Sequence, residues 1–157
     1  MVISHLYHYL GFKVMLAGTF NGGSYAMSIA SAVLDILTPQ EQLRIEHLSN
    51  GLADSCREII HRYKLPAHIV NLGNKGCIFV QNGPVTEVHN YRQFAHHSNR
   101  IIEQVLPVYF QNRNVWIQWK DEWTISAQHS QEDIDIFIST FESFAELWAR
   151  KIELEKA

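Results

Sequence analysis

The pattern of hydrophobic and polar positions predicts four helices and four strands. Residues 24–37 (SYAMSIASAVLDIL) are apolar or small around nearly the whole helical circumference, which is typical of a buried helix. The next helix is predicted to start at Thr38, where threonine can act as the cap, Pro39 suits the first helical position and Glu41 completes a capping box. Apolar residues then recur at helical spacing until Pro66 ends the element: Leu48, Leu52, Cys56, Ile59 and Tyr63.

Short runs of β-branched and aromatic residues predict two pairs of strands. The first pair is 67–73 (AHIVNLG) and 76–81 (GCIFVQ), which lie around a turn. The second pair is 114–120 (NVWIQWK) and 122–128 (EWTISAQ).

The third predicted strand, 114–120, carries two tryptophans, Trp116 and Trp119. In a strand, Val115, Ile117 and Trp119 would share one face, while Trp116 and Gln118 would share the other. Because both faces carry apolar bulk, we expect this strand to be covered on both sides, either within this chain or by a further domain.

Two more helices complete the pattern. Residues 90–110 read as one helix that Pro107 must kink or end. The last helix begins after Ser130, which can form a capping box with Asp133, and it carries a buried stripe: Ile134, Phe137, Ile138, Phe141, Phe144 and Trp148. This order predicts an α+β fold, a small and mostly antiparallel sheet of three or four strands with helices covering one face.

Composition narrows the class of protein. The chain has 157 residues, is 46% hydrophobic and 18% charged, and carries a formal net charge of −3, so we expect a globular chain that binds neither nucleic acid nor membrane. No apolar run is long enough to span a bilayer, and the N-terminal stretch lacks the features of a signal peptide. Cys56 and Cys77 are far apart, which fits a reducing cytoplasm and neither a zinc site nor a disulfide framework.

The segment 18–27 (GTFNGGSYAM) places glycines and hydroxyl groups directly before a helix. A hydroxyl, free backbone N–H groups and a helix N-terminus favour an anion such as a phosphate. The alternative is an ordinary glycine-rich turn in which Ser24 or Asn21 caps the helix, and the sequence chemistry alone favours that alternative.

The same residues resemble a known family. The stretch 17–37 (AGTFNGGSYAMSIASAVLDIL) resembles the alanine-glycine-threonine segment, turn and alanine-rich helix of class III pyridoxal-phosphate aminotransferases, above all the glutamate-1-semialdehyde aminomutases. The run 114–135 (NVWIQWKDEWTISAQHSQEDID) resembles the end of their small domain, and 76–80 (GCIFV) stands where they have a glycine-led strand. The resemblance covers about residues 16–149.

The resemblance implies a fold, a cofactor and a binding loop. The chain would be the C-terminal portion of a fold-type I enzyme, with 1–23 as the end of the large domain and 24–157 as a connecting helix plus the small domain. Gly18, Thr19 and Phe20 would bind the phosphate of pyridoxal 5'-phosphate across a homodimer. This chain has Gly23-Ser24 where the relatives have asparagine-proline, so the helix entrance loses the rigidity of proline.

Catalysis by the chain alone is not expected. Such an enzyme needs a lysine that holds the cofactor and transfers a proton, and in this family it precedes the glycine-threonine loop. Only Lys13 precedes Gly18 here, and it lacks the expected glycine-rich context. We therefore assign no catalytic residue, and expect a small amino or keto substrate to be handled together with a large-domain chain or domain.

Two other interpretations remain open. The chain could be a non-catalytic α+β module that self-associates or binds a partner. A metal site is disfavoured, because the histidine pairs His5/His8 and His96/His97 have no carboxylate or cysteine at ligand spacing. We interpret His129 as a structural residue at the start of the last helix.

Overall fold

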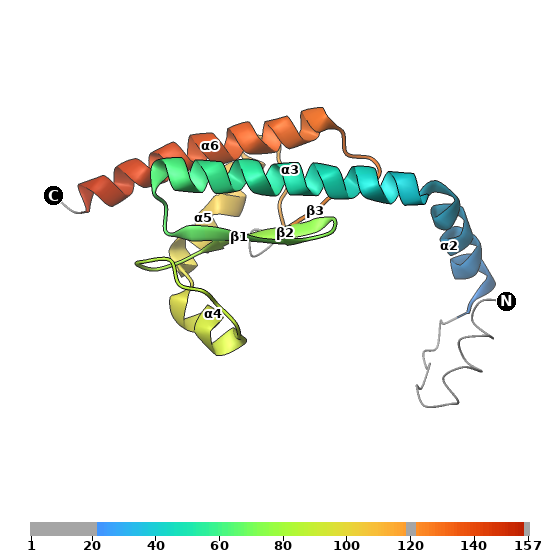
Figure 1. Ribbon diagram of the computed structural model, residues 1–157, viewed down its shortest axis with the longest axis horizontal. Helices are drawn as coiled ribbons and strands as arrows, with labels where there is room; N and C mark the ends of the chain where they lie inside the picture. Colours follow the sequence, from blue (N-terminus) through green and yellow to red (C-terminus); the bar gives the residue numbers. More distant parts are fainter. Residues whose placement is uncertain (1–21, 119–121, 156–157) are drawn as a thin grey trace. The chain divides into compact units, whose positions relative to one another are not determined.

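A computed structural model of the chain describes residues 22–118 and 122–155 (Figure 1). The chain divides into two compact units, with the boundary between Thr38 and Pro39. The described part of the smaller unit contains helix α2 (Ser24–Ile36).

Helix α2 forms where it was predicted, but the expectation that it is buried was wrong. None of its residues is buried, and Tyr25 and Leu34 are 81% and 70% exposed. The sequence pattern reports that a helix has apolar faces to cover. The pattern does not show which residues would cover those faces. The described residues of this chain do not cover them.

The larger unit is a three-stranded antiparallel sheet with helices on both sides. Its strands are β1 (Ala67–Leu72), β2 (Lys75–Val80) and β3 (Glu122–Thr124), in the order β1-β2-β3. Its helices are α3 (Pro39–Tyr63), α4 (Tyr91–His97), α5 (Arg100–Gln111) and α6 (Gln131–Leu154). The predicted α+β architecture with a small antiparallel sheet is confirmed, but the expectation that helices cover one face was wrong, because Phe94 of α4 packs against Phe79 of β2 on the other face.

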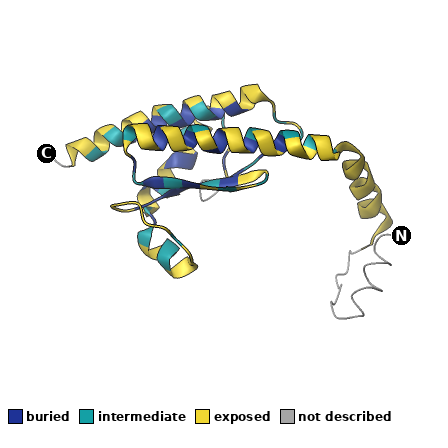
Figure 2. Cartoon of the chain, in the orientation of Figure 1, coloured by how far each residue is buried: buried dark blue, intermediate teal, exposed yellow. Residues whose placement is uncertain are grey.

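Helices α3 and α6 lie side by side over one face of the sheet, and the short α4 lies on the other side (Figure 1). Figure 2 shows that the buried surfaces of α3 and α6 face the strands, while their outer surfaces are exposed. Both helices therefore bury one stripe each, as their periodicity predicts. The fully buried side chains at the centre include Leu52, Leu106, Phe110 and Phe141.

Local signals set the ends of α3 and α6. Helix α3 begins at Pro39, as predicted, and ends at Tyr63, after which Lys64 adopts a positive φ of 51°. Helix α6 begins after Ser130, whose side chain accepts the Asp133 N–H while the Asp133 carboxylate accepts the Ser130 N–H. The predicted capping box is confirmed.

The first predicted strand pair is also confirmed, and a tight hairpin joins it. Leu72 pairs with Lys75, so two residues form the loop, and Gly73 adopts a φ of 57° at its first position. Glycine at that position suits a type II′ turn, which matches the twist of the strands. On the neighbouring strand, Gly76 pairs with Trp123, whose ring occupies the space where a Cβ of residue 76 would lie.

The helix predicted at 90–110 is two helices, and Pro107 neither ends nor separates them. The break falls at Ser98, which forms an isolated bridge with Gln81, and Asn99 then caps α5 by accepting the N–H of Ile102. A tertiary contact with the sheet therefore decides where the helix is interrupted. Pro107 lies buried inside α5.

The strand predicted at 114–120 does not form in its described part. Residues 114–118 make one isolated bridge, between Gln118 and Glu122, and Trp119 lies outside the described residues. Trp116 is 80% exposed and the neighbouring Ile117 is buried, so the described residues cover this segment on one side and do not supply the cover expected for the other. Of the strand predicted at 122–128, only the first three residues form a strand, β3.

Among the described residues, no helix is both long enough and apolar enough to cross a membrane.

Candidate functional site

The predicted phosphate-binding residues Gly18, Thr19 and Phe20 lie outside the described residues. The structure begins at Gly22, whose φ of 78° is a backbone conformation that favours glycine. The N-cap of α2 is Gly23, which supplies no side-chain cap, and the first turn carries no acidic residue.

The start of α2 has no side-chain cap among the described residues. The first N–H groups of any helix have no acceptor within the helix, and a side-chain cap or an anion normally satisfies them. At α2 the capping position is a glycine, and the alternative in which Ser24 caps the helix is wrong, because Ser24 is the first helical residue. The predicted phosphate loop and the alternative cap at Asn21 both lie outside the described residues.

The lysines of the described part offer no enclosed site for a covalent cofactor. Lys64 follows α3, Lys75 opens β2 and Lys151 lies on α6, and all three are exposed. A lysine that reacts at neutral pH is normally desolvated, since burial lowers its pKa.

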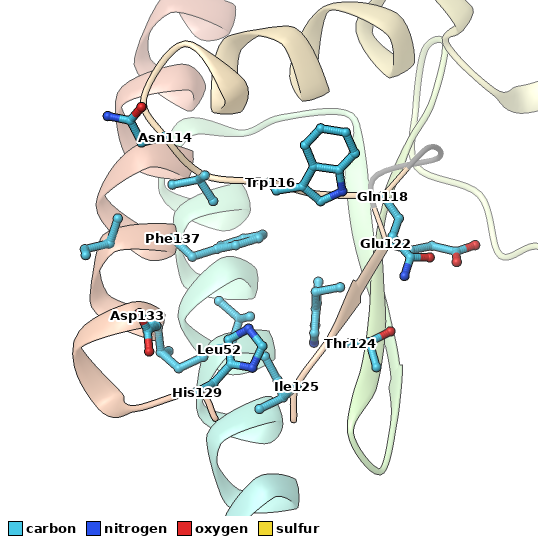
Figure 3. A pocket seen from close by; sticks show the side chains of 14 residues that line it. Leu52, Asn114, Trp116, Gln118, Glu122, Thr124, Ile125, His129, Asp133 and Phe137 are labelled. Carbon is cyan, nitrogen blue, oxygen red and sulfur yellow. The ribbon is translucent and has the colours of Figure 1, made fainter. Parts of the chain in front are cut away.

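A pocket of about 450 Å³ lies between α3, α6, β3 and the segment 114–118 (Figure 3). Ile125, Ile134 and Phe137 are among the apolar residues that line it, and Phe137 points from α6 into the hollow. Trp116 stands at its side and exposes 80% of its surface. A cavity of this size with an exposed aromatic ring can hold the apolar part of a small molecule.

Polar groups converge on the same pocket from the turn before α6. Nδ1 of His129 accepts the N–H of Ser126 at 3.1 Å and lies 2.9 Å from the Oγ of Ser126. These bonds fix the imidazole to its own turn, so the structural role expected for His129 is supported. Glu122 also lines the pocket and is exposed.

Two charged carboxyl groups near this turn, those of Asp133 and Glu41, have lowered pKa values. Hydrogen bonds from the Ser130 backbone and side chain lower the pKa of Asp133. Arg44 of α3 bonds the Glu41 carboxylate, which lowers the pKa of Glu41, and also donates to the carbonyls of Ala127 and His129. Arg44 therefore holds the turn against α3.

Among the described residues that line the pocket, no metal-binding cluster is found. Within the described residues no three histidine, cysteine or acidic side chains converge on a point where a metal could bind. His129 lies beside Ser126, but its Nδ1 is engaged by that residue's own backbone. The pocket can therefore bind and orient a ligand, and the described residues supply no nucleophile with an activating base.

Sequence reasoning missed Trp116 and Asn114 as pocket residues. Asn114 adopts a positive φ of 61°, which turns the chain between α5 and the segment that follows. Asparagine tolerates this conformation better than most residues, so an asparagine just after a helix was the available signal.

Two curated relatives carry the name glutamate-1-semialdehyde 2,1-aminomutase. The protein from Ruminiclostridium cellulolyticum is 29% identical over 140 residues, covering 82% of this chain and 30% of its own length. The protein from Anaeromyxobacter sp. is 32% identical over 76 residues, covering 48% of this chain and 18% of its own length. This chain therefore spans less than a third of these relatives. No protein-family model matches it.

Solved structures show the same fold. A Pseudomonas aeruginosa glutamate-1-semialdehyde aminomutase in complex with PMP matches 82% of this chain with a TM-score of 0.73 at 18% identity. A β-phenylalanine aminotransferase from Variovorax paradoxus matches 83% of it with the same TM-score and identity. The match covers 28% and 30% of those chains.

The resemblance inferred from the sequence is thereby confirmed. In sequence this chain is similar to glutamate-1-semialdehyde aminomutases, in fold it matches part of the fold-type I transaminases, and its share of about 30% is consistent with the C-terminal portion of a class III pyridoxal-phosphate aminotransferase.

Proposed function

We propose that this chain acts as the C-terminal portion of a pyridoxal-phosphate-dependent aminotransferase or aminomutase. Residues 1–23 would end the large domain and carry the phosphate loop, and 24–157 would form the connecting helix and the small domain. The loop residues Gly18, Thr19 and Phe20 would hold the cofactor phosphate of the other subunit in a homodimer.

One structural observation supports this role more than any other. The start of α2, directly after the predicted loop, has a glycine at the N-cap and no acidic residue in the first turn. Its N–H groups and helix dipole would stabilise the negative charge of a phosphate, and the Thr19 hydroxyl would add one more donor. When bound, the cofactor would supply the electron sink for amino-group transfer.

The pocket of the larger unit would bind the substrate. Trp116 and Phe137 would contact the apolar part of a small amino or keto substrate, while Gln118 and Glu122 would contact its polar groups. The small domain would thus close over the substrate and exclude water.

The chain alone is proposed to be inactive. The described lysines are exposed, and the one lysine before the loop, Lys13, stands in the sequence context GFKVML rather than a glycine-rich one. The lysine that binds the cofactor covalently would therefore come from a large-domain chain or domain. The two cysteines form no disulfide with each other, which fits a reducing cytoplasm as the site of action.

The test is complementation of a truncated relative. The aminomutase of Ruminiclostridium cellulolyticum, shortened to end before its matched region, is co-expressed with this chain and assayed with pyridoxal phosphate. We expect aminomutase or transaminase activity only when both chains are present. Thr19→Val should reduce cofactor affinity, whereas Gly51→Ala, on an exposed site of α3, should leave it unchanged.

Borohydride reduction followed by mass spectrometry tests inactivity directly. The proposal expects no cofactor attached to any lysine of this chain alone. Attachment that a single lysine substitution abolishes would contradict it.

A non-catalytic, self-associating or partner-binding module is the second candidate. The exposed apolar residues of α2 favour it, because an apolar helix in water tends to associate. If the two chains neither co-purify nor restore activity, while this chain alone forms a stable dimer, this candidate is the better description.

A further inference from the structure

We propose that the outer edge of β1, together with the groove beside it, binds an extended polypeptide segment that combines apolar residues with an acidic side chain. The site lies within the larger unit and is separate from the pocket of Figure 3. The inference does not rest on the proposed cofactor chemistry.

The register shows which backbone groups of β1 face outward. β1 is an edge strand, and the N–H of Gln81 donates to the carbonyl of Pro66. Hydrogen-bonded pairs alternate along an antiparallel ladder, so the N–H and C=O groups of Ile69 and Asn71 point away from β2. Within residues 22–118 and 122–155 these outward groups have no hydrogen-bond partner.

A groove of about 490 Å³ runs beside the first half of this edge. It lies between the end of α3, the start of β1 and the loop after β2. The apolar groups that line it come from all three segments: Ile60, Leu65, Ala67, Ile69 and Val85. An added strand would therefore find backbone partners on β1 and an apolar surface for alternate side chains.

The charged side chains that line the groove, Arg57 and Lys64, are cationic, and no carboxylate lines it. Arg57 is already engaged by Asp54 and by the side-chain oxygen of Asn71. Lys64 makes no ion pair within the described part of the chain, so it is the group that an acidic side chain of the ligand would meet.

The charge pattern selects a partner segment rather than a second copy of this chain. Antiparallel pairing of two β1 edges around a two-fold axis near Val70 would place the hairpin end of one copy beside the basic groove of the other. That hairpin end carries Lys75 and no carboxylate. An acidic segment replaces this repulsion with attraction, and electrostatic complementarity of this kind excludes wrong partners.

The experiment uses the full chain and a fluorescein-labelled synthetic peptide, Ser-Val-Glu-Val-Thr-Ile-Glu-Ser. Anisotropy should show saturable binding, and hydrogen exchange should show that the Ile69 and Asn71 amides gain protection. Lys64→Glu should weaken binding about ten-fold, because it replaces an attraction by a repulsion. The matched control Lys151→Glu, on the exposed surface of α6, should bind as the unaltered chain does.

Every other result overturns the proposal. A peptide with lysines in place of glutamates that binds equally well would exclude charge recognition, as would unchanged binding by a Lys64→Glu variant with an unaltered circular dichroism spectrum. Absence of binding would exclude the site. Protection of the same two amides that rises with protein concentration without peptide would show that a second copy is the occupant.

Discussion

Replacing Gly76 by alanine tests how the sheet is packed against α3. A Cβ at position 76 would lie 2.1, 2.4 and 2.6 Å from three ring carbons of Trp123. Ordinary contact begins near 3.4 Å, so the indole must move by about 1.3 Å (3.4 minus 2.1). The ring cannot move freely, because its Nε1–H donates to the buried Oγ of Ser49 at 3.2 Å and its centroid lies 6.0 Å from that of Phe137.

The expected cost follows from these contacts. Overpacking costs about 1–3 kcal/mol, loss of the buried hydrogen bond about 1–3 kcal/mol, and the stiffer unfolded chain of the alanine variant returns about 0.4–1 kcal/mol. Gly76→Ala should therefore lower the free energy of unfolding by about 3 kcal/mol, which corresponds to a fall in Tm of roughly 10 °C. Urea unfolding followed by far-UV circular dichroism measures the change in the free energy of unfolding.

Two control variants test whether the clash with Trp123 is the cause. Gly51→Ala, inside α3 where a Cβ meets nothing within 4 Å, should raise stability by about 0.5–1 kcal/mol. In a Trp123→Leu background, Gly76→Ala should cost little, because the clashing ring atoms are gone. If Gly76→Ala is as stable as the unaltered chain, or costs the same in the Trp123→Leu background, the packing argument is wrong.

Three further outcomes follow from single buried groups. Ser49→Ala should destabilise by about 1–3 kcal/mol in urea unfolding, because it leaves the Trp123 N–H without an acceptor in the core. Burial lowers the pKa of His68 below 6.5. The stability that depends on neutral His68 is therefore complete above pH 6.5 and is lost as the pH falls through the lowered folded-state value. Between those two values, the free energy of unfolding should fall less with decreasing pH in His68→Leu than in the unaltered chain. Burial raises the pKa of the Cys56 thiol to about 12, so iodoacetamide should modify the half-buried Cys77 first, and mass spectrometry should find Cys56 unmodified until the chain unfolds.

The proposed function and the β1-edge inference fail in different ways. Complementation depends on residues 18–20 and on the pocket at Trp116, whereas peptide binding depends on Lys64 and the outward amides of β1. A chain that binds the peptide but never restores activity would act as a binding module. Restored activity without peptide binding would leave the enzyme proposal intact.

Features that depend on a few neighbouring residues could be read from the sequence. The start of α3 at Pro39, the hairpin around Gly73 and the capping box of Ser130 with Asp133 are of this kind. Their bonds join residues a few positions apart, so the same local chemistry acts whatever the rest of the chain does. The family resemblance also came from ordered short motifs, and the relatives confirm it.

Features that depend on contacts between distant segments were decided only by the tertiary structure. The helix at 90–110 breaks at Ser98 because that residue bridges to Gln81 across the sheet edge, and no local pattern reports this pairing. Trp116 is exposed while Ile117 is buried, although both are apolar, because the position of the segment against α3 and α6 decides which side chain the core admits. The sequence therefore determined where α3, the β1–β2 hairpin and α6 begin, whereas the loss of the strand at 114–118, the burial of side chains, the interruption of the helix at 90–110 and the free edge of β1 follow from how the elements pack together.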